Sequence, residues 1–512
     1  MTEQSQSEAI DFLCRLMRRA DGIAPQILRT HGATLLLGRT DAYKIKRALR
    51  YDYLDFSTQQ KRHDMLQREL DLNRPRAASI YRDVIAVTRN EDGGLRMGGG
   101  GQVVEWVLRM HRFDTANELS QVAQRGALSD DLAADLGTVV ARYHDAAPVS
   151  SLSGAALIDG VLNQVNAAFA DMTDLFGAGA VARYSRVSRR AFCALRPQMD
   201  ARGAAGHVRR CHGDLHLGNI VLMEGAPVLF DALEFSETLG TCDVLYDLAF
   251  LLMDLDHKGL RRAANIVLNS YLSQRAGAEH LSALGLLPLF QSLRAAVRAM
   301  VSVQAEKGEE ARGYLAHALR CLKPPLAWMI AIGGRSGTGK SVLAASLAPL
   351  IGAAPGAVHL RSDLERKAYF GVAPLVRLPE SAYTPDISAR ICEIMRNKAR
   401  QALAAGHGAV LDATWLGPGE GAALEQLARQ TGVPFTGLWL TAGSETLVER
   451  VSARRGDASD ADAAVVRNQT GQGPAGWECI DAGGSRAETL HRAAAALNLA
   501  PVADRRAQDR KG

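Results

Sequence analysis

Hydrophobic positions in the first part of the chain follow two different periods. An apolar residue recurs every three or four positions over residues 10–20 and 57–72, and this period predicts two helices. Shorter apolar segments around the second helix predict strands at residues 34–37, 42–45, 80–88 and 102–108. Because strands stand on both sides of a helix, the pattern indicates a small mixed lobe over about residues 20–110.

From residue 111 the pattern changes to long amphipathic stretches. These stretches predict helices within residues 128–144, 155–200, 241–275 and 286–320. They indicate a larger helical lobe over about residues 111–322, which completes a first domain of residues 1–322. The prolines of Lys323-Pro324-Pro325 cannot continue a helix, so residues 323–325 are a predicted linker.

Behind this linker, apolar strands and helices alternate. The predicted strands are residues 327–332, 357–360, 409–412 and 435–440. The predicted helices between them are residues 340–350, 387–405 and 422–430. This alternation predicts an α/β domain with a parallel sheet over residues 326–503, followed by a charged, disordered tail at 504–512. No internal repeat is visible, so the two halves are expected to be different folds.

Composition narrows the possible environments and partners. The 512 residues are 47% apolar and 22% charged, as in ordinary globular proteins, and the formal net charge is only +5. The basic residues are not massed in one segment, so we expect no nucleic-acid partner. The seven cysteines are scattered without zinc-binding spacing, which favours free thiols in a reducing compartment. The apolar run 244–255 is interrupted by Asp247 and Asp254, so we expect a cytoplasmic protein without a membrane partner. The pattern does not indicate the oligomeric state.

A first chemical motif, His-Gly-Asp-Leu-His-Leu-Gly-Asn, occupies residues 212–219 and is followed by Asp231. In kinase-type phosphoryl transfer, an acidic loop residue orients the substrate hydroxyl. An Asn five positions later and an Asp beyond it hold Mg²⁺. Asp214 is therefore the candidate catalytic residue, and Asn219 and Asp231 are the candidate metal ligands.

This motif resembles that of the aminoglycoside phosphotransferase (APH)-like family of small-molecule kinases, as does the segment Asp-Val-Leu-Tyr-Asp-Leu-Ala at 243–249. The resemblance covers about residues 20–320 and implies an α+β, protein-kinase-like domain of two lobes. It also implies a strand lysine for the nucleotide phosphates and a helix glutamate that orients this lysine. Lys46 is the candidate lysine, Lys44 on the same strand face is the alternative, and Glu69 is the candidate partner.

A second motif reads GxxxxGKS and lies between an apolar strand and a helix-forming segment, which is the context of a P-loop. Backbone N–H groups of such a loop cradle phosphates at a helix N-terminus. We therefore expect a nucleotide site formed by Gly334, Arg335, Ser336, Gly337, Thr338, Gly339, Lys340 and Ser341. Lys340 is expected to act on the β- and γ-phosphates, and the Ser341 hydroxyl to bind Mg²⁺.

Four further residues complete this second candidate site. Asp412 ends an apolar strand and is the candidate carboxylate for Mg²⁺ or its water shell. Asp363 also follows a strand, and it either orients the acceptor hydroxyl as a catalytic residue or caps a helix. Arg450 and Arg454 are the candidate arginines of a lid that neutralises phosphate charge, or they form a solvated helix end.

Residues 326–500 resemble the small P-loop kinases of the gluconate kinase and zeta-toxin-like group. One departure from that group is the segment 415–421, which lacks the arginine that relatives usually place there. The order of the two halves resembles that of bacterial bifunctional phosphotransferase/ATP-binding proteins.

The combined motifs predict a bifunctional ATP- and Mg²⁺-dependent phosphotransferase. Its expected acceptors are hydroxyl groups of small molecules such as sugars, sugar acids or aminoglycoside-like compounds. Polycationic aminoglycosides would need clustered carboxylates, for which the candidates are Asp243, Asp247, Asp254 and Asp256, although we expect Asp247 to be structural. In the alternative hypothesis, one half is the active kinase and the other is a nucleotide-binding regulatory module. A kinase for protein or nucleic-acid ends is disfavoured by the absence of a basic stripe, and ATP versus GTP stays open for the first half.

Overall fold

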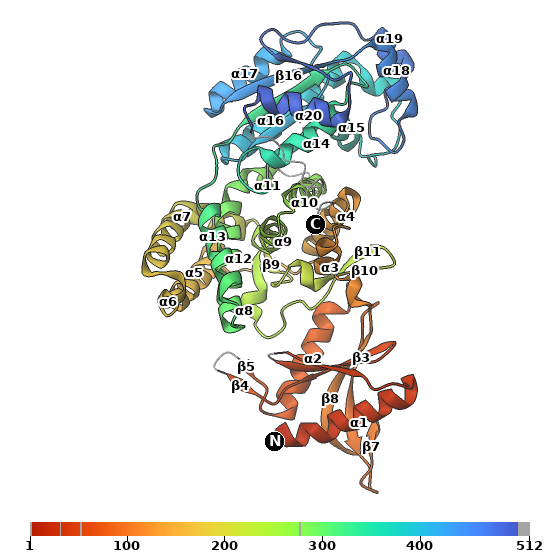
Figure 1. The fold of residues 1–512 in the computed structure, drawn as a ribbon, viewed down its shortest axis with the longest axis vertical. Helices are drawn as coiled ribbons and strands as arrows, with labels where there is room; N and C mark the ends of the chain where they lie inside the picture. The colour runs from red at the N-terminus through yellow and green to blue at the C-terminus, as the bar shows by residue number, and fades with distance from the viewer. Residues whose placement is uncertain (1–2, 31, 52–53, 276–277, 500–512) are drawn as a thin grey trace, which may run out of the picture. The chain divides into compact units, whose positions relative to one another are not determined.

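The computed structural model describes residues 3–30, 32–51, 54–275 and 278–499 (Figure 1). Its contacts divide the chain into two compact units. The first unit contains Met1–Gln164 and Cys193–Asp254, and the second contains Val165–Phe192 and Leu255–Gly512. The predicted tail at 504–512 lies outside the described residues.

The first unit begins with a six-stranded antiparallel sheet. Its strands stand in the order β1 (Gln26–Arg29), β2 (Ala33–Leu37), β3 (Asp41–Lys46), β8 (Gln102–His111), β6 (Tyr81–Arg89) and β7 (Leu95–Met97). A short separate pair is formed by β4 (Arg50–Tyr51) and β5 (Leu54–Asp55). The four predicted strands are confirmed as β2, β3, β6 and β8. Strand β1 is exposed at all four positions, so it carries no alternation of apolar residues from which to predict it.

Two helices cover the faces of this sheet, namely α1 (Glu3–Asp21) and α2 (Gln59–Asn73). In β3, Tyr43 and Ile45 belong to the apolar cluster that includes α1, whereas Ala42 belongs to the cluster that includes α2. Because strand side chains alternate between faces, Lys44 and Lys46 lie on the α2 side together with Ala42. The alternation of β3 therefore directs both lysines toward one helix.

The rest of the first unit is mainly helical. Its helices, three of which continue into residues of the second unit, are α3 (Leu119–Gln124), α4 (Asp130–Asp145), α5 (Gly154–Ala170), α7 (Ala178–Ala204), α8 (Glu237–Gly240) and α9 (Val244–His257). Two antiparallel pairs accompany them, namely β9 (Val208–Arg210) with β12 (Thr241–Asp243), and β10 (Ile220–Met223) with β11 (Ala226–Leu229).

The second unit combines helices with a parallel sheet. The helices before the sheet are α6 (Thr173–Phe176), α10 (Arg261–Ser273), α11 (Ala278–Ser282), α12 (Leu287–Gln304) and α13 (Gly308–Cys321). The predicted parallel sheet is confirmed, in the order β14 (Val358–Arg361), β15 (Ala409–Asp412), β13 (Met329–Gly334), β16 (Phe435–Thr441) and β17 (Glu478–Asp481). The helices that accompany it are α14 (Lys340–Leu347), α15 (Ser362–Tyr369), α16 (Pro385–Ala404), α17 (Glu420–Thr431), α18 (Ser444–Ala453), α19 (Ala463–Asn468) and α20 (Arg486–Ala496).

The order of the parallel sheet places its first strand, β13, at the centre. This strand is bonded to β15 on one side and to β16 on the other, so the chain connections leave it in both directions. Ligands of open α/β sheets bind at such a switch point, outside the carboxyl ends of the strands. The GxxxxGKS loop begins at Gly334, the last residue of β13, and therefore lies at this point.

Helix α10 closes the edge of this sheet at β14. Asn269 Oδ1 accepts a hydrogen bond from the backbone N–H of His359 over 2.7 Å. Asn265 Nδ2 donates to the carbonyl oxygen of Ala357 over 3.0 Å. Two amide side chains thus form hydrogen bonds with backbone groups at the edge of the sheet. Unpaired backbone groups of an edge strand can otherwise pair with a strand of another chain.

This packing changes the division of the chain that we expected from the sequence. The predicted domains, 1–322 and 326–503, meet at the linker 323–325, whereas the contacts group residues 165–192 and 255–321 with the parallel sheet. Within 255–321, Asn265 and Asn269 of α10 make hydrogen bonds that a search for amphipathic periods does not register.

One helical stretch of the described residues, Glu279–Gln304, is long and apolar enough to cross a membrane by length and composition. Of its most apolar window, 67% is buried inside the protein. Burial inside the protein therefore accounts for most of this apolar window.

We predict that Asn269→Ala weakens the closed edge of the parallel sheet. The change removes the acceptor of the His359 N–H, and an unpaired buried donor costs about 1–3 kcal/mol of unfolding free energy. Hydrogen exchange at the His359 amide should accelerate accordingly. The control is Asn397→Ala, which removes only an exposed contact with Arg400 on α16. Unchanged protection of His359 in Asn269→Ala would contradict the assignment.

Candidate active sites

The loop formed by residues 212–219 follows β9, and Asp247 holds its backbone. The N–H groups of His212 and Gly213 donate to the two carboxylate oxygens of Asp247 over 3.1 and 2.8 Å. The Nε2 atom of His212 donates to the carbonyl oxygen of Phe230 over 2.9 Å. Burial lowers the pKa of His212 in spite of the carboxylates around it. A neutral His212 ring therefore braces the loop.

Glycine is required at position 213 for two separate reasons. Its φ is +83°, a region that residues with a side chain rarely adopt. A Cβ atom there would lie 3.1 Å from both the Cα of Gly240 and the Cβ of Leu233. The backbone of the loop can therefore approach its neighbours only because residue 213 has no side chain.

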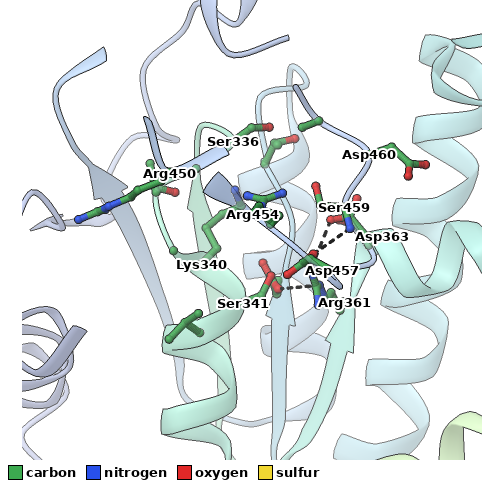
Figure 2. Close-up of a pocket in the computed structure, with 18 of the residues that line it drawn as sticks. Ser336, Lys340, Ser341, Arg361, Asp363, Arg450, Arg454, Asp457, Ser459 and Asp460 are labelled. Carbon is green, nitrogen blue, oxygen red and sulfur yellow. Dashed lines mark hydrogen bonds and ion pairs between the residues drawn. The ribbon is translucent and has the colours of Figure 1, made fainter. Parts of the chain in front are cut away.

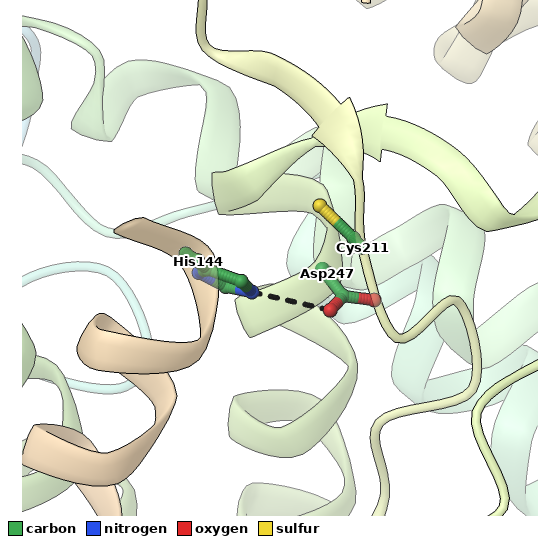
Figure 3. A group of neighbouring side chains, drawn as sticks. All are labelled: His144, Cys211 and Asp247. Atoms are coloured by element: carbon green, nitrogen blue, oxygen red, sulfur yellow. Dashed lines mark hydrogen bonds and ion pairs between the residues drawn. The ribbon is translucent and has the colours of Figure 1, made fainter. Parts of the chain in front are cut away.

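His144, Cys211 and Asp247 form a buried group beside this loop (Figure 3). Their potential ligand atoms all lie within 4.8 Å of one another, which by itself is compatible with a metal ion. However, His144 Nε2 lies 3.1 Å from Asp247 Oδ2, and both oxygens of Asp247 already accept backbone N–H groups. The hydrogen bonds account for the burial of Asp247, and the group supports the loop.

The three residues of the first motif lie together. Asn219 Nδ2 donates to the main-chain oxygen and to Oδ2 of Asp214, each over 2.9 Å. The hairpin of β10 and β11 then returns the chain, so that the Phe230 N–H donates to the Asn219 carbonyl over 3.0 Å. Asp231 follows with φ +59°, a strained conformation for a non-glycine residue that is common at functional sites.

These residues fit a divalent cation. Asn219 uses its Nδ2 on Asp214, which leaves the amide oxygen as a ligand, and the side chain of Asp231 is 42% exposed. Oxygen ligands of this kind are those that Mg²⁺ prefers. Burial alone would raise the pKa of Asp231, but the ammonium group of Lys44 outweighs it and holds the pKa below its ordinary value.

Both candidate lysines of β3 reach Glu69. The Nζ atoms of Lys44 and Lys46 lie 2.7 Å from Glu69 Oε1 and Oε2, respectively. The second partner of Lys44 is Asp231, at 2.9 Å, whereas the second partner of Lys46 is Glu234, at 2.5 Å. The structure therefore brings Glu69 to both lysines and places Lys44 beside the candidate metal ligand Asp231.

The prediction that Asp243 and Asp254 belong to a carboxylate cluster for a polycationic acceptor is wrong. Asp243 is buried in an ion pair with Arg202, at 2.7 and 2.8 Å. Asp254 Oδ2 accepts the N–H of Leu217 over 3.0 Å and is also buried. Asp247, which we expected to be structural, holds the loop as described above. Because these carboxylates are already bound to an arginine or to backbone N–H groups, they are not available to bind a cationic sugar.

In the second unit, three glycines shape the P-loop. Gly334, Gly337 and Gly339 have φ values of +140°, +85° and +89°. A Cβ atom at Gly337 would lie 2.8 Å from the carbonyl oxygen of Leu447, so a side chain is excluded there. Helix α14 begins directly behind the loop at Lys340, which places its first N–H groups toward the loop.

A cavity of about 880 Å³ opens at this loop (Figure 2). Its walls include residues 336–343, 361–363, 412, 450, 453–455, 457 and 459–462. In the view of Figure 2, Arg450 lies on the left and Asp460 on the right, with Lys340, Ser341 and Arg454 between them. Residues 336–341 of the predicted loop, Asp363, Asp412 and both candidate arginines thus line one cavity, whereas Gly334 and Arg335 are not among its lining residues.

The charges around Lys340 differ from those around the lysines of β3. Lys340 Nζ donates to the carbonyl oxygen of Arg335 over 3.0 Å. Burial lowers the pKa of Lys340, and the charges of Asp412 and Asp363 offset this effect only in part. For Asp412, burial would raise the pKa, but the neighbouring His359, together with Lys340, holds it below its ordinary value.

Asp412 and Ser341 fit a magnesium ion. Asp412 Oδ2 is buried and makes no hydrogen bond within the part of the chain that the structure describes. The Ser341 side chain lines the same cavity. The Nε atom of Arg361 lies 3.9 Å from this oxygen, which is too far for a hydrogen bond, so the oxygen can still bind a cation. A hydroxyl beside a P-loop lysine is the usual second protein ligand.

The two candidate lid arginines have different positions. Arg450 donates to the backbone carbonyls of Ala482, Gly483 and Gly484, at 2.8, 3.4 and 3.0 Å, so it fixes the segment in front of α20. By contrast, Nη1 of Arg454 is buried and has no hydrogen-bond partner among the described residues. Arg454 is therefore the arginine whose donor is available for a phosphate.

The sequence pattern did not predict the partners of Asp457 and Asp460 on the opposite wall of the cavity. Asp460 Oδ2 accepts hydrogen bonds from Lys367 Nζ, the Tyr383 hydroxyl and the Leu378 N–H, at 2.5, 2.5 and 3.0 Å. Arg361 is paired in the same way with Asp457. These partners lie 77–96 positions apart in the chain, and no local spacing links them. The acidic segment Asp-Ala-Ser-Asp at 457–460 was the sequence feature that could have indicated these ion pairs.

Two regions of the chain match family models. Residues 86–284 match the Phosphotransferase enzyme family (APH), and residues 329–472 match an AAA domain (AAA_33). The first match contains Asp214, Asn219 and Asp231, and the second contains the P-loop. The chain thus contains one region similar to phosphotransferase enzymes of the APH type and one region similar to P-loop domains, which agrees with a phosphotransferase enzyme.

Relatives are similar to the whole chain or to one half of it. An uncharacterized protein of Mycobacterium tuberculosis (strain H37Rv) is 28% identical over 485 residues, which cover 91% of this chain and 94% of the relative. A gluconokinase structure from Sinorhizobium meliloti 1021 is 20% identical and covers 34% of this chain and 93% of its own, with a TM-score of 0.25. A choline/ethanolamine kinase family protein from Mesorhizobium loti is 15% identical and covers 62% and 95%, with a TM-score of 0.38.

We predict that Gly213→Ala disables the first site. The added methyl group must displace the backbone of Gly240 or the side chain of Leu233, and a shift of the loop moves Asp214. A misplacement of about 1 Å lowers turnover by about a hundredfold. ATP turnover by the full chain, with the second site silenced by Lys340→Ala, measures the effect.

The matched control for this prediction is Gly225→Ala. Gly225 has almost the same φ as Gly213, +84° against +83°, but nothing lies within 4 Å of its Cβ position, so its substitution adds backbone strain without a clash. We expect turnover within about twofold of the parent. Equal losses in the two variants would mean that strain, rather than the close approach at Gly213, governs the loop.

Proposed function

We propose that the protein is a bifunctional, ATP- and Mg²⁺-dependent kinase that phosphorylates hydroxyl groups of small molecules. The observation that carries this proposal is the assembly of Asp214, Asn219, Asp231 and a lysine–glutamate pair in one unit, with an independent P-loop cavity in the other. Each set contains a phosphate-binding lysine, oxygen ligands for Mg²⁺ and a carboxylate for the acceptor. Two complete sets support two transfer reactions.

In the first site, Asp214 is the residue that accepts the proton of the acceptor hydroxyl. Its side chain is 42% exposed, and Asn219 fixes one carboxylate oxygen. Asn219 and Asp231 would hold Mg²⁺, which neutralises phosphate charge when bound. The strand lysine would orient the α- and β-phosphates, and Glu69 positions that lysine.

In the second site, Asp363 is the residue that accepts the hydroxyl proton. Burial raises its pKa above the ordinary value, although Arg361 opposes this effect. A base with a raised pKa takes a proton more readily than an ordinary aspartate does. Lys340, the P-loop backbone and Arg454 would hold the phosphates, while Ser341 and Asp412 would hold Mg²⁺.

The linings of the sites favour different acceptors. Arg361, Arg366 and Arg377 line the cavity of the second unit, and Asp457 and Asp462 pair with Arg361 and Arg377. Arg366 bonds to uncharged groups, and its Nε has no hydrogen-bond partner among the described residues, which favours an acceptor with a negative charge, such as a sugar acid. In the first unit, Asp243 and Asp254 are committed to the fold, which argues against a polycationic aminoglycoside. We therefore propose a neutral or weakly charged hydroxylated metabolite for the first site.

A second candidate function assigns a regulatory role to the P-loop half. The observation in its favour is that the Ser336 N–H donates to Gln469 Oε1 over 2.7 Å, so a side chain of the protein occupies a donor of the loop. In this version the half binds nucleotide without transferring phosphate.

Single-site variants distinguish these functions. We expect Asp214→Ala and Lys340→Ala each to lower ATP consumption with one set of acceptors by about a thousandfold and to leave the other set unaffected. The assay is ATP consumption with a panel of sugars, sugar acids and aminoglycosides, and Lys323→Ala at the exposed linker is the control. If Asp214→Ala abolishes all turnover and Lys340→Ala abolishes none, the P-loop half is regulatory. If neither variant changes turnover, the proposed sites are wrong.

The pH dependence of the second site should follow Asp363. Activity requires the deprotonated carboxylate, so it should fall as the pH drops through the raised pKa of Asp363, above the range of an ordinary aspartate. The Ser459 hydroxyl donates to this carboxylate and lowers its pKa, so Ser459→Ala should move the acid limb of kcat/KM to still higher pH. Ser452→Ala, on the exposed side of α18, is the control. A limb that stays in place or moves down in Ser459→Ala contradicts this role.

A further inference from the structure

The first site contains one more buried lysine than its proposed chemistry requires. Five ionisable side chains, called here the lysine–carboxylate cluster, are joined by four ion pairs. They are Lys44, Lys46, Glu69, Asp231 and Glu234. A single strand lysine paired with a helix glutamate is sufficient for a kinase-type site. The second lysine therefore needs an explanation of its own.

Glu69 is the centre of this cluster. Its side chain is completely buried, and each of its oxygens is held by one lysine over 2.7 Å. A buried carboxylate without a cation is strongly disfavoured. With two cations in place, Glu69 stays neutralised even when one of the lysines turns to another partner.

The two lysines differ in their second partner and in their access. Lys44 contacts Asp231, the candidate Mg²⁺ ligand, and 12% of its side chain is exposed. Lys46 contacts Glu234, lies 5.8 Å from the centre of the Phe56 ring, and is only 3% exposed. Lys44 is thus at the metal site, and Lys46 is enclosed behind it.

Helix α2 is tied to the segment after Asp231 by a further residue. Asn73 Oδ1 accepts the N–H of Ala232 over 2.9 Å, and Asn73 Nδ2 donates to the main-chain oxygen of Glu69 over 2.9 Å. The helix therefore occupies its place next to Asp231 through contacts that do not involve Lys44.

We propose that Lys44 is the phosphate-binding lysine and that Lys46 is a positioning residue, which holds Glu69 and α2 in the working arrangement before nucleotide binds. This inference rests on the proposed function of the first site. When Mg²⁺ and phosphates compete for Asp231 and Lys44, the side chain of Lys46, which also pairs with Glu234, still holds Glu69. The arrangement needs no external signal to bring α2 into place, unlike sites in which the lysine–glutamate pair must be assembled by a regulatory step.

The two lysines serve as matched variants, since they lie on the same strand face and share Glu69. Both are changed to Met in the full chain with Lys340→Ala, and binding of Mg²⁺ with a non-hydrolysable ATP analogue is measured by calorimetry. Lys44→Met should weaken binding by about tenfold or more and lower kcat by about a hundredfold. Lys46→Met should change affinity by less than about threefold but lower kcat by about tenfold, with faster hydrogen exchange in α2.

Conservative variants cover the case in which Lys46→Met does not fold. Lys46→Arg keeps a cation on Glu69 and should restore most of the kcat and the protection of α2, whereas Lys44→Arg should not restore phosphate binding. The inference is overturned if Lys46→Met or Lys46→Arg abolishes nucleotide binding while Lys44→Met retains it. If the Lys340→Ala parent itself binds no nucleotide, the proposed function of the first site fails instead.

Discussion

The electrostatic balance between a buried lysine and the carboxylates around it sets the chemistry of both halves. In the first site, Asp231 lies 2.9 Å from Lys44, and the attraction raises the pKa of Lys44 well above its ordinary value although burial opposes it. In the second site, Lys340 bonds to a backbone carbonyl instead, burial prevails, and its pKa is lowered. The first site is thus a set of paired charges that nucleotide must partly separate. The second keeps an excess of positive charge, with Arg454 beside Lys340, that phosphate can neutralise.

The elements and motifs that depend on local order were predictable from the sequence. A strand period of two places Lys44 and Lys46 on one face of β3, and an apolar segment of four residues is sufficient to identify β15, which ends at Asp412. The P-loop was predictable because its glycines, lysine and serine are neighbours in the chain and need no distant partner to take their shape. The family matches at residues 86–284 and 329–472 agree with the two chemistries read from these short segments.

Features that depend on distant contacts could not be predicted in the same way. Asp214 and Asp231 are separated by a hairpin whose geometry the motif implies, but the choice between the lysines of β3 depends on a carboxylate 187 positions away. Arg450 and Arg454 have the same sequence context, four residues apart on one helix end. Arg450 has a structural role because its guanidinium group donates to the backbone carbonyls of residues 482–484, and the sequence does not reveal this contact. The sequence identifies the charged side chains that are candidates for function. The packing of distant segments determines which of these side chains lack a partner within the protein.

The edge strand β14 links the stability of the second unit to its acceptor side. Near its start, α10 bonds to the backbone at Ala357 and His359, and at its end the strand delivers Arg361, which pairs with Asp457. His359 and Arg361 are about 7 Å apart along an extended strand, so a displacement at one end is transmitted to the other. His359 also lies 3.6 Å from Asp412. The helix that groups with the P-loop half therefore covers the edge of the sheet and at the same time helps to position the cavity wall that carries Arg361.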